Sequence, residues 1–214
     1  MGQKVNPIIY RIGKIYNSKS RWFADKFSYG KKILEDYKLR ELFESKLKLA
    51  GLVKVEIERS VSTLKIFLFV AKPGVVIGKG GSNLEILKKQ VQRIITKKKG
   101  EKYKISLNVE EVRVPDLSAK LVSERMSDQI LKRMPHRRVI NQAIDKVMQA
   151  GAKGVKIQLS GRINGSEIGR TEKYFKGSVP TQTLRSDIDY FENPILTRSG
   201  YVGLKVWIYK GDIL

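Results

Sequence analysis

A glycine turn separates two apolar patterns between Pro73 and Val91, and it limits what this stretch can form. A short apolar run ends at Gly78, and Lys79, Gly80 and Gly81 follow before a helical pattern begins. Glycine has no Cβ, so another backbone can approach such a turn closely. Lys79 adds a mobile positive charge at the tip. The four residues from Gly78 to Gly81 are therefore candidates for contact with a phosphate backbone.

The next helix is expected to begin at Ser82. Glu85 stands three residues later, and Ser-x-x-Glu before an apolar repeat predicts a capping box. Apolar residues recur at helical spacing, and the pattern runs to about Lys99; they are Leu84, Leu87, Val91, Ile94 and Ile95. Free N–H groups and the helix dipole favour an anion at this N-terminus. A lone Gly-x-x-Gly is common in ordinary turns, so its meaning depends on context.

The charge balance supplies part of that context. Lys and Arg number 43 against 21 Asp and Glu, which gives a net charge of +22. Such self-repulsion destabilises a compact chain, and a polyanionic partner would relieve it. Cations bound to phosphates release counterions, and this dominates non-specific affinity for nucleic acids. The alternative is a basic protein whose charges are only solvated.

Composition excludes several kinds of site. The chain has no cysteine, and its single histidine, His136, cannot form a cluster, so we expect no disulfide, metal or cofactor. There is no P-loop, and the glycine turn lacks the spacing of a dinucleotide fold. We expect no small-molecule substrate. No apolar run approaches ~18 residues, so no membrane span is expected, and the N-terminus lacks the apolar core of a signal peptide.

Residues 1–30 are expected to form an irregular extension in which basic and aromatic residues alternate. The basic residues are Lys4, Arg11, Lys14, Lys19, Arg21 and Lys26, and the aromatic ones are Tyr10, Tyr16, Trp22, Phe23, Phe27 and Tyr29. Cations suit phosphates and rings suit exposed bases, so Lys4 and Arg11 are candidate RNA contacts. Alternatively, the extension folds over a neighbouring domain and its aromatic residues anchor it.

Residues 31–112 follow a helix–strand–strand–turn–helix–strand order. The pattern predicts a helix over Lys31–Ala50, strands near 53–57 and 64–70 that form a hairpin, and a third strand over Tyr103–Val109. This order, with Gly-x-x-Gly before the second long helix, resembles the type II KH domain. The resemblance implies that the loop clamps the backbone of a few nucleotides.

Residues 113–214 are expected to form a second domain, which begins where Arg113-Val114-Pro115 breaks the pattern. Asp116 is a candidate N-cap of a helix to about Met134, and Arg137–Met148 is a second helix. Strands are expected near 155–159, 170–175, 179–190 and 201–209. Two helices and a four-stranded sheet make an α+β domain, so the whole chain is assigned to the α+β class.

Further cations are candidate RNA contacts. Arg137 and Arg138 lie in the first turn of a helix, where the dipole opposes them and a ligand phosphate would compensate. Solvation of the pair is the alternative. Others are expected on the turns of the second domain: Arg162, Arg170, Lys173 and Arg185.

Many separate matches, in the correct order, make the chain similar to the bacterial-type small-subunit ribosomal proteins of the uS-three family. The matching stretches are Met1–Pro7, Pro73–Gly81, Gly151–Lys156, Ser160–Arg162, Glu167–Glu172, Val179–Pro180, Leu184–Tyr190 and Gly203–Ile208. The resemblance implies a place in the head of the small subunit, with rRNA and neighbouring head proteins as partners. It also implies a share in the mRNA entry passage and in unwinding mRNA through Arg137 and Arg138. Asn141 departs from the family, which has a basic residue there.

Two other functions are weighed. A free KH-domain RNA-binding or ribosome-assembly factor would share the first domain, although known assembly factors with this KH type lack the second half. The other is an enzyme, either an NTP-dependent helicase, which the missing P-loop disfavours, or a nuclease. A nuclease would need clustered carboxylates, and Asp187 and Asp189 share a strand, with Glu172 as a third candidate. Pairing with nearby arginines explains them better, so no catalytic residue is expected. A ribosomal protein of this type would act in the cytoplasm, or in the matrix or stroma of an organelle.

Overall fold

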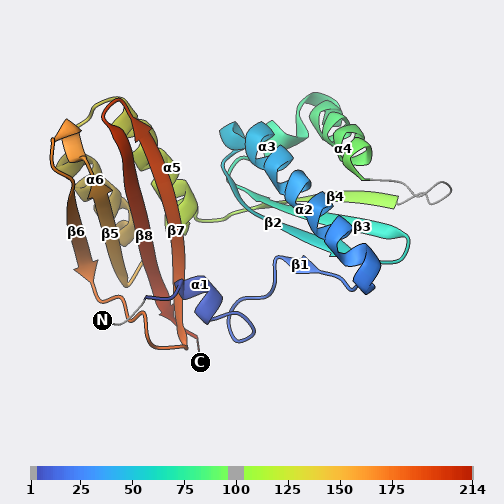
Figure 1. Cartoon of the computed structure of the whole chain (residues 1–214), viewed down its shortest axis with the longest axis horizontal. Coiled ribbons are helices and arrows are strands. Elements are labelled where there is room, and N and C mark those ends of the chain that lie inside the picture. Colours follow the sequence, from blue (N-terminus) through green and yellow to red (C-terminus); the bar gives the residue numbers. More distant parts are fainter. Residues whose placement is uncertain (1–3, 96–103, 214) are drawn as a thin grey trace. The chain divides into compact units, whose positions relative to one another are not determined.

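The computed structural model describes residues 4–95 and 104–213. Within them the contacts form two compact units (Figure 1). One spans residues 18–113, and the other joins the N-terminal residues up to Asn17 to the chain from Val114 onward. Three parts of the sequence interpretation lie outside the described residues: the end of the helix expected to run to about Lys99, the strand start at Tyr103, and residues 1–3.

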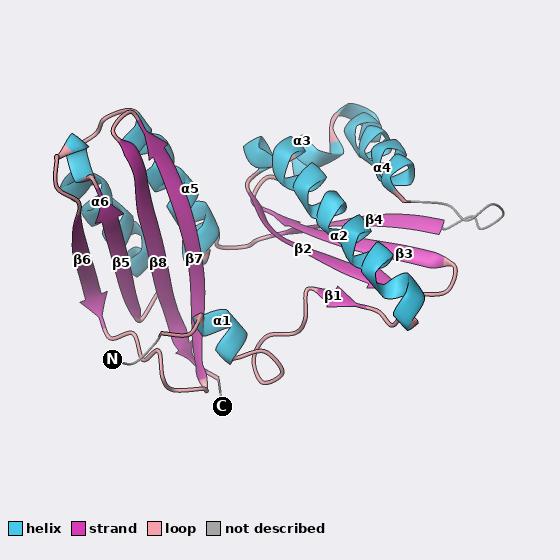
Figure 2. Ribbon diagram, in the orientation of Figure 1, coloured by secondary structure: helices cyan, strands magenta, loops and turns pink. Residues whose placement is uncertain are grey.

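The unit of residues 18–113 has helices against a four-stranded sheet (Figure 2). Its elements are β1 (Ser20–Arg21), α2 (Lys26–Lys46), a 3-10 turn (Lys48–Ala50), β2 (Leu52–Arg59), β3 (Thr63–Val70), α3 (Pro73–Ile77), a 3-10 turn (Lys79–Gly81), α4 (Ser82–Ile94) and β4 (Lys104–Glu111). The strand order is β1-β2-β3-β4. Strands β2 and β3 are antiparallel, which confirms the hairpin, whereas β1 and β4 pair parallel to their neighbours.

Apolar periodicity explains these elements. Leu39, Phe43 and Leu47 recur at four-residue spacing and are buried along α2. Alternate residues of β2 and β3, such as Ile57 and Ile66, are fully buried beneath them. Three limits differ from expectation. Helix α2 already begins at Lys26, inside the stretch expected to be irregular, and it ends at Lys46, before the 3-10 turn that reaches Ala50. Helix α4 ends at Ile94 rather than near residue 99.

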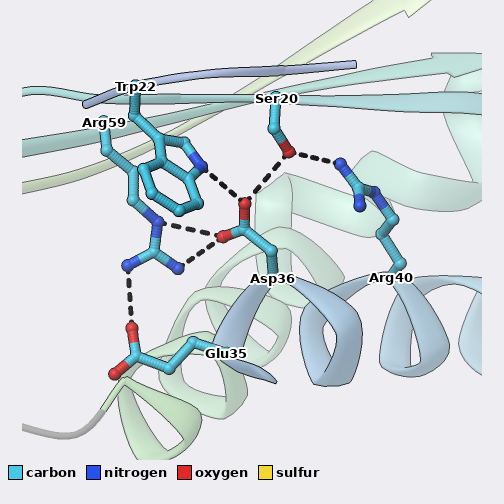
Figure 3. Close-up of polar contacts among 6 residues, drawn as sticks. All are labelled: Ser20, Trp22, Glu35, Asp36, Arg40 and Arg59. Carbon is cyan, nitrogen blue, oxygen red and sulfur yellow. Dashed lines mark hydrogen bonds and ion pairs between the residues drawn. The ribbon is translucent and has the colours of Figure 1, made fainter. Parts of the chain in front are cut away.

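Two buried carboxylates hold the start of this unit together (Figure 3). Asp36 of α2 accepts hydrogen bonds from Trp22 Nε1 at 2.8 Å and Ser20 Oγ at 3.0 Å. Arg59 of β2 donates to Asp36 and, at 2.7 Å, to Glu35. The network ties β1, α2 and β2 to one another. Trp22 is thus an anchor, as the alternative interpretation of the N-terminal aromatic residues proposed.

The other unit has two long helices against one antiparallel sheet. Its elements are α1 (Pro7–Tyr10), a 3-10 turn (Pro115–Leu117), α5 (Ala119–Leu131), α6 (His136–Gln149), β5 (Gly154–Gly161), a 3-10 turn (Ile163–Gly165), β6 (Arg170–Gly177), β7 (Ser186–Thr197) and β8 (Gly200–Asp212). The strand order is β6-β5-β8-β7. In Figure 1, α5 and α6 lie behind this sheet. Alternate strand residues, such as Ile157 and Val206, point into the core beneath the helices.

Two expectations for this unit were wrong. The strand expected over 179–190 begins only at Ser186 and continues to Thr197, so that β7 and β8 form a long hairpin. Asp116 does not cap α5, because it lies in a 3-10 turn and pairs with Arg125 at 2.6 Å. The N–H of Ala119, at the start of α5, donates instead to Asp189 Oδ2 at 2.9 Å, across 70 positions in the sequence.

Arg11 explains why the chain before β7 is not a strand. Its side chain is fully buried, and it donates to the carbonyls of Ser186 at 2.6 Å and Thr183 at 2.8 Å. Further carbonyls accept from the same guanidinium: Pro7, Thr181 and Pro180, at 3.0, 3.0 and 3.3 Å. A buried carbonyl needs a donor, and Arg11 supplies one where a strand partner would have done so. The prediction that Arg11 contacts RNA was therefore wrong, because its guanidinium is buried and donates to carbonyls inside the fold.

Replacing Arg11 with alanine is expected to lower the free energy of unfolding by more than about 3 kcal/mol, because several carbonyls lose a donor from a charged group. Arg11→Lys keeps the charge but has fewer donors, so its free energy of unfolding should lie between those of the wild type and Arg11→Ala. Lys14→Ala, at an exposed neighbour, is the control and should change stability by less than about 0.5 kcal/mol. Urea denaturation of the full chain measures all three. Equal stability of Arg11→Ala and Lys14→Ala would contradict the structural role.

Candidate nucleic-acid interface

The glycine turn has a backbone that other residues adopt with difficulty. Gly78 has φ 72° and ψ 179°, a region open essentially to glycine alone, and a Cβ there would lie 2.8 Å from the Asn83 side chain. Gly80 and Gly81 are left-handed, with φ 60° and 82°. A Cβ at either would meet nothing within 4 Å among the described residues. The space over these two glycines is therefore open to an approaching backbone.

Helix α4 begins at Ser82 as expected, but the capping box was wrong. Ser82 already has helical angles, φ −57° and ψ −41°, and left-handed Gly81 occupies the N-cap position. No side chain caps α4 within the described residues. Asn83 instead donates to the carbonyl of Val75 at 3.2 Å and fastens the turn to α3. The N–H of Ser82 donates to the carbonyl of Lys79, and no side chain caps the N–H groups that follow it in α4.

Charges next to the turn add to its attraction for an anion. Lys79 is exposed at the tip, and α4 buries Leu87 and Val91. The exposed side of the same helix carries three further cations that the sequence interpretation did not single out: Lys88, Lys89 and Arg93. Their position opposite the buried stripe follows from the helical period and could have been predicted.

Arg137 and Arg138 occupy the exposed first turn of α6, as expected. The helix begins with buried His136, whose Nε2 lies 2.9 Å from Glu172 Oε2 on β6. Glu172 thus places a negative charge near the helix N-terminus, which offsets part of the cost of the two arginines. Because Glu172 already supplies a negative charge there, helix α6 can carry Arg137 and Arg138 in its first turn without a bound phosphate.

Glu172 is the centre of a hydrogen-bonded group on β6. It accepts from Tyr174 OH and from Arg170 Nε, each at 2.6 Å. These bonds, that of Tyr174 first, lower the pKa of Glu172 from 4.5 to about 2. Burial, followed by Glu172, raises the pKa of Tyr174. Arg137 also interacts with Tyr174 and acts in the opposite direction, lowering that pKa. Arg138 has no carboxylate within ion-pair distance in the described part of the chain, so it remains free to meet an anion.

The remaining predicted cations lie in different places. Arg162 holds its own turn, donating to the carbonyls of Ser166 at 2.7 Å and Ser199 at 3.3 Å. Arg170 and Arg185 are exposed but paired, with Glu172 and Asp212 respectively. Lys4 and Lys173 line one groove of the sheet and are the only two of this set that the structure brings together there.

The sequence matches two known domain families, one in each half of the chain. A sequence model described as KH domain matches residues 38–117, and one described as Ribosomal protein S3, C-terminal domain, matches residues 126–208. Relatives named small ribosomal subunit protein uS3 align over the whole chain. That of Caldicellulosiruptor saccharolyticus is 45% identical over 94% of its own length, that of Desulforamulus reducens 44% over 94%, and that of Persephonella marina 45% over 92%.

The chain belongs to the uS3 family of small-subunit ribosomal proteins. The predicted α+β class, with a KH domain followed by a second domain, is confirmed. The family is one of structural ribosomal proteins, not enzymes, which agrees with the absence of a predicted catalytic residue. None of the helices in the described ranges has the length and apolar character needed to cross a membrane.

The carboxylates weighed as a nuclease site of this uS3 family member do not form one. Glu172 lies on β6 and Asp187 on β7, at opposite edges of the sheet. Asp187 accepts a hydrogen bond from Tyr16, and Asp189 caps α5. Burial raises the pKa of Asp189. Residues 4–95 and 104–213 contain no group of three or more His, Cys, Asp or Glu able to hold a metal ion.

Lys156 of β5 is a site residue that sequence reasoning missed. It points away from the core, between buried Val155 and Ile157, and is only partly exposed. Burial, followed by the charges of Lys4 and Lys173, lowers its pKa. The period of two along β5 marks it as outward-facing, but its neighbours come from β6 and the N-terminus. Only the strand pairing shows that these cations are crowded together.

The low pKa of Glu172 predicts a pH-dependent contribution to stability. A depressed carboxyl pKa stabilises the fold fully above the unfolded value, near 4.5, and the contribution is lost as pH falls toward about 2. Glu172→Gln should therefore lower the unfolding free energy by a constant amount above about pH 5, and the difference from wild type should shrink toward pH 2. Denaturation curves at several pH values measure this. The control is Glu167→Gln, at an exposed position, and a difference that does not change with pH would contradict the assignment.

Proposed function

We propose that this chain is a structural constituent of the head of the small ribosomal subunit, where it binds small-subunit rRNA and neighbouring head proteins and helps to form the mRNA entry passage. Family membership and the net charge of +22 support this proposal. As a division by function we propose an N-terminal extension over 1–30, a KH domain over 31–112 and a C-terminal domain over 113–214, whereas the compact units divide the chain between residues 17 and 18 and between 113 and 114. Its place of action would be the ribosome, in the cytoplasm or in an organelle.

One observation carries the RNA-binding proposal: the Gly78–Gly81 turn is open and cationic and leads into an uncapped helix. Gly80 and Gly81 have free space above them, and Lys79 is exposed. The N–H of Ser82 is bonded to the carbonyl of Lys79, but no side chain of the described chain caps the N–H groups that follow it in α4. Together they offer donors, charge and room to a sugar-phosphate backbone.

The proposed contact with mRNA involves the start of α6. Arg137 and Arg138 are exposed there, one engaged with Tyr174 and the other free of carboxylates within the described ranges. Asn141 and Gln142, one turn later, are exposed and uncharged. An activity that separates mRNA strands would therefore depend on two cations at this helix.

The alternative of a free KH-domain factor is distinguished by salt. The relatives align with this chain through both domains, which supports a permanent component. Small subunits washed at high salt should then retain the protein in a one-to-one ratio, whereas a transient factor would be removed. Loss of the protein under conditions that leave other head proteins bound would contradict the proposal.

Gly80→Asp tests the turn without forcing the backbone, because Asp tolerates left-handed angles and the space there is open. The added carboxylate should weaken binding of the purified chain to single-stranded RNA by about tenfold, which corresponds to ~1.4 kcal/mol. Gly80→Asn is the matched control, with the same shape and no charge, and should bind nearly as well as wild type. Fluorescence anisotropy at several salt concentrations measures affinity. Equal affinities of the two variants would count against the turn as a contact.

Arg137→Ala with Arg138→Ala should slow translation through an mRNA hairpin by several-fold more than translation through an unstructured mRNA. The physical reason is the loss of two phosphate contacts where strands would separate. Reconstituted ribosomes and paired reporter mRNAs measure the ratio. Lys132→Ala with Lys146→Ala, also exposed, is the control. Equal slowing on both mRNAs would point to a positional role only.

A further inference from the structure

The sheet of the unit that contains β5 to β8 has two unlike faces. Helices α5 and α6 cover one face, where alternate residues form the core. In Figure 2 the opposite face is turned to the viewer, with α1 near one end of it. The strand register identifies the residues on this open face. One cross-strand row contains Phe175, Lys156, Trp207 and Tyr190, and the next contains Lys173, Gln158, Lys205 and Glu192.

Cations on this face are crowded and poorly neutralised. Lys4, Lys156 and Lys173 line one groove of about 980 Å³. No carboxylate of the described chain lies within ion-pair distance of these three side chains. Glu192, which lines the same groove, pairs with Lys205 at 3.3 Å. Burial first, and then the charges of Lys4 and Lys173, lower the pKa of Lys156, so part of this shift comes from repulsion among the three lysines. An anion in the groove would relieve that repulsion.

Aromatic rings stand beside these cations. Trp207 and Tyr190 are neighbours across β8 and β7, with ring centroids 5.1 Å apart and planes at 41°. Lys156 Nζ lies 5.1 Å from the centroid of Trp207. Phe175, paired with Lys156 from the other side, is 74% exposed. Unstacked bases bind to such rings, whereas bases inside a duplex cannot reach them.

We propose that this open face is a second RNA-binding surface that takes a single-stranded segment, with phosphates on Lys4, Lys156 and Lys173 and bases against Trp207 and Phe175. Charge complementarity selects a polyanion, and the aromatic row selects one that has flat, exposed rings. The inference rests on the proposed RNA-binding function and extends it to a surface separate from the glycine turn. A protein partner on this face would have to supply several carboxylates to the same three lysines.

The test uses the full chain and a labelled 12-nucleotide single-stranded RNA, with a duplex of equal length for comparison. Lys156→Gln with Lys173→Gln should weaken single-strand binding at least tenfold near 0.1 M salt. It should also reduce the slope of log K against log salt by about 1.4, because two phosphate contacts are lost at about 0.7 each. Trp207→Leu should weaken binding about fivefold or more and leave the slope unchanged, because stacking is not ionic.

Lys132→Gln with Lys146→Gln is the matched control, with the same charge change on exposed residues of the helical side. It should alter affinity less than threefold. Circular dichroism and the melting temperature establish that each variant is folded. If Lys156→Gln with Lys173→Gln does not fold, the single variant Lys156→Gln takes its place in the binding measurement. Duplex RNA should be affected less than the single strand by Trp207→Leu.

The outcomes separate this inference from the proposed function. If Gly80→Asp weakens RNA binding while the Lys156, Lys173 and Trp207 variants bind as the control does, the sheet-face proposal is overturned and the proposed function stands. If neither set weakens binding, both fail. If the sheet-face variants bind RNA normally but lose a head protein from reconstituted subunits, the face is a protein interface and the RNA proposal is wrong.

Discussion

Carboxylates are scarce in this chain, and their scarcity determines which of its cations are paired. There are 21 of them against 43 Lys and Arg, and the most buried ones hold the fold together. Asp36 and Glu35 join α2 to β2 through Arg59, Asp36 joins α2 to β1 through Ser20, and Glu172 joins the start of α6 to β6. Carboxylates used in this way cannot neutralise the surface. The surplus cations therefore remain available to an external polyanion.

Some cations are nevertheless structural, and burial separates the two kinds. Arg11 is fully buried and donates only to carbonyls, whereas Lys79 and Arg138 are exposed. Arg170 is intermediate, because it is exposed and also lowers the pKa of Glu172. The same residue type thus serves as an internal hydrogen-bond donor or as a surface charge. Its role follows from the number of unpaired carbonyls or carboxylates around it.

Local patterns predicted most of the fold, and long-range contacts account for two of the errors, the cap of α5 and the start of β7. The apolar periods of α2, α4, α6 and the β2–β3 hairpin are properties of adjacent residues, so they could be read directly. The cap of α5 could not, because Asp189 lies far away in the sequence. The chain before β7 shows the same limit: a strand was expected from residue 179, but the distant guanidinium of Arg11, and not a strand partner, donates to its carbonyls. At the candidate interface the glycine turn was visible in the sequence, whereas the crowding of Lys156 required the strand order.

If the surplus positive charge destabilises the folded chain, binding of RNA should remove that destabilisation. Thermal unfolding of the purified full chain, with and without small-subunit rRNA, tests this most directly at low and high salt. The account predicts a melting temperature that rises by several degrees with RNA at low salt, and a rise that disappears as salt screens the phosphates. A melting temperature unchanged by RNA at low salt, or a rise that persists at high salt, would contradict it.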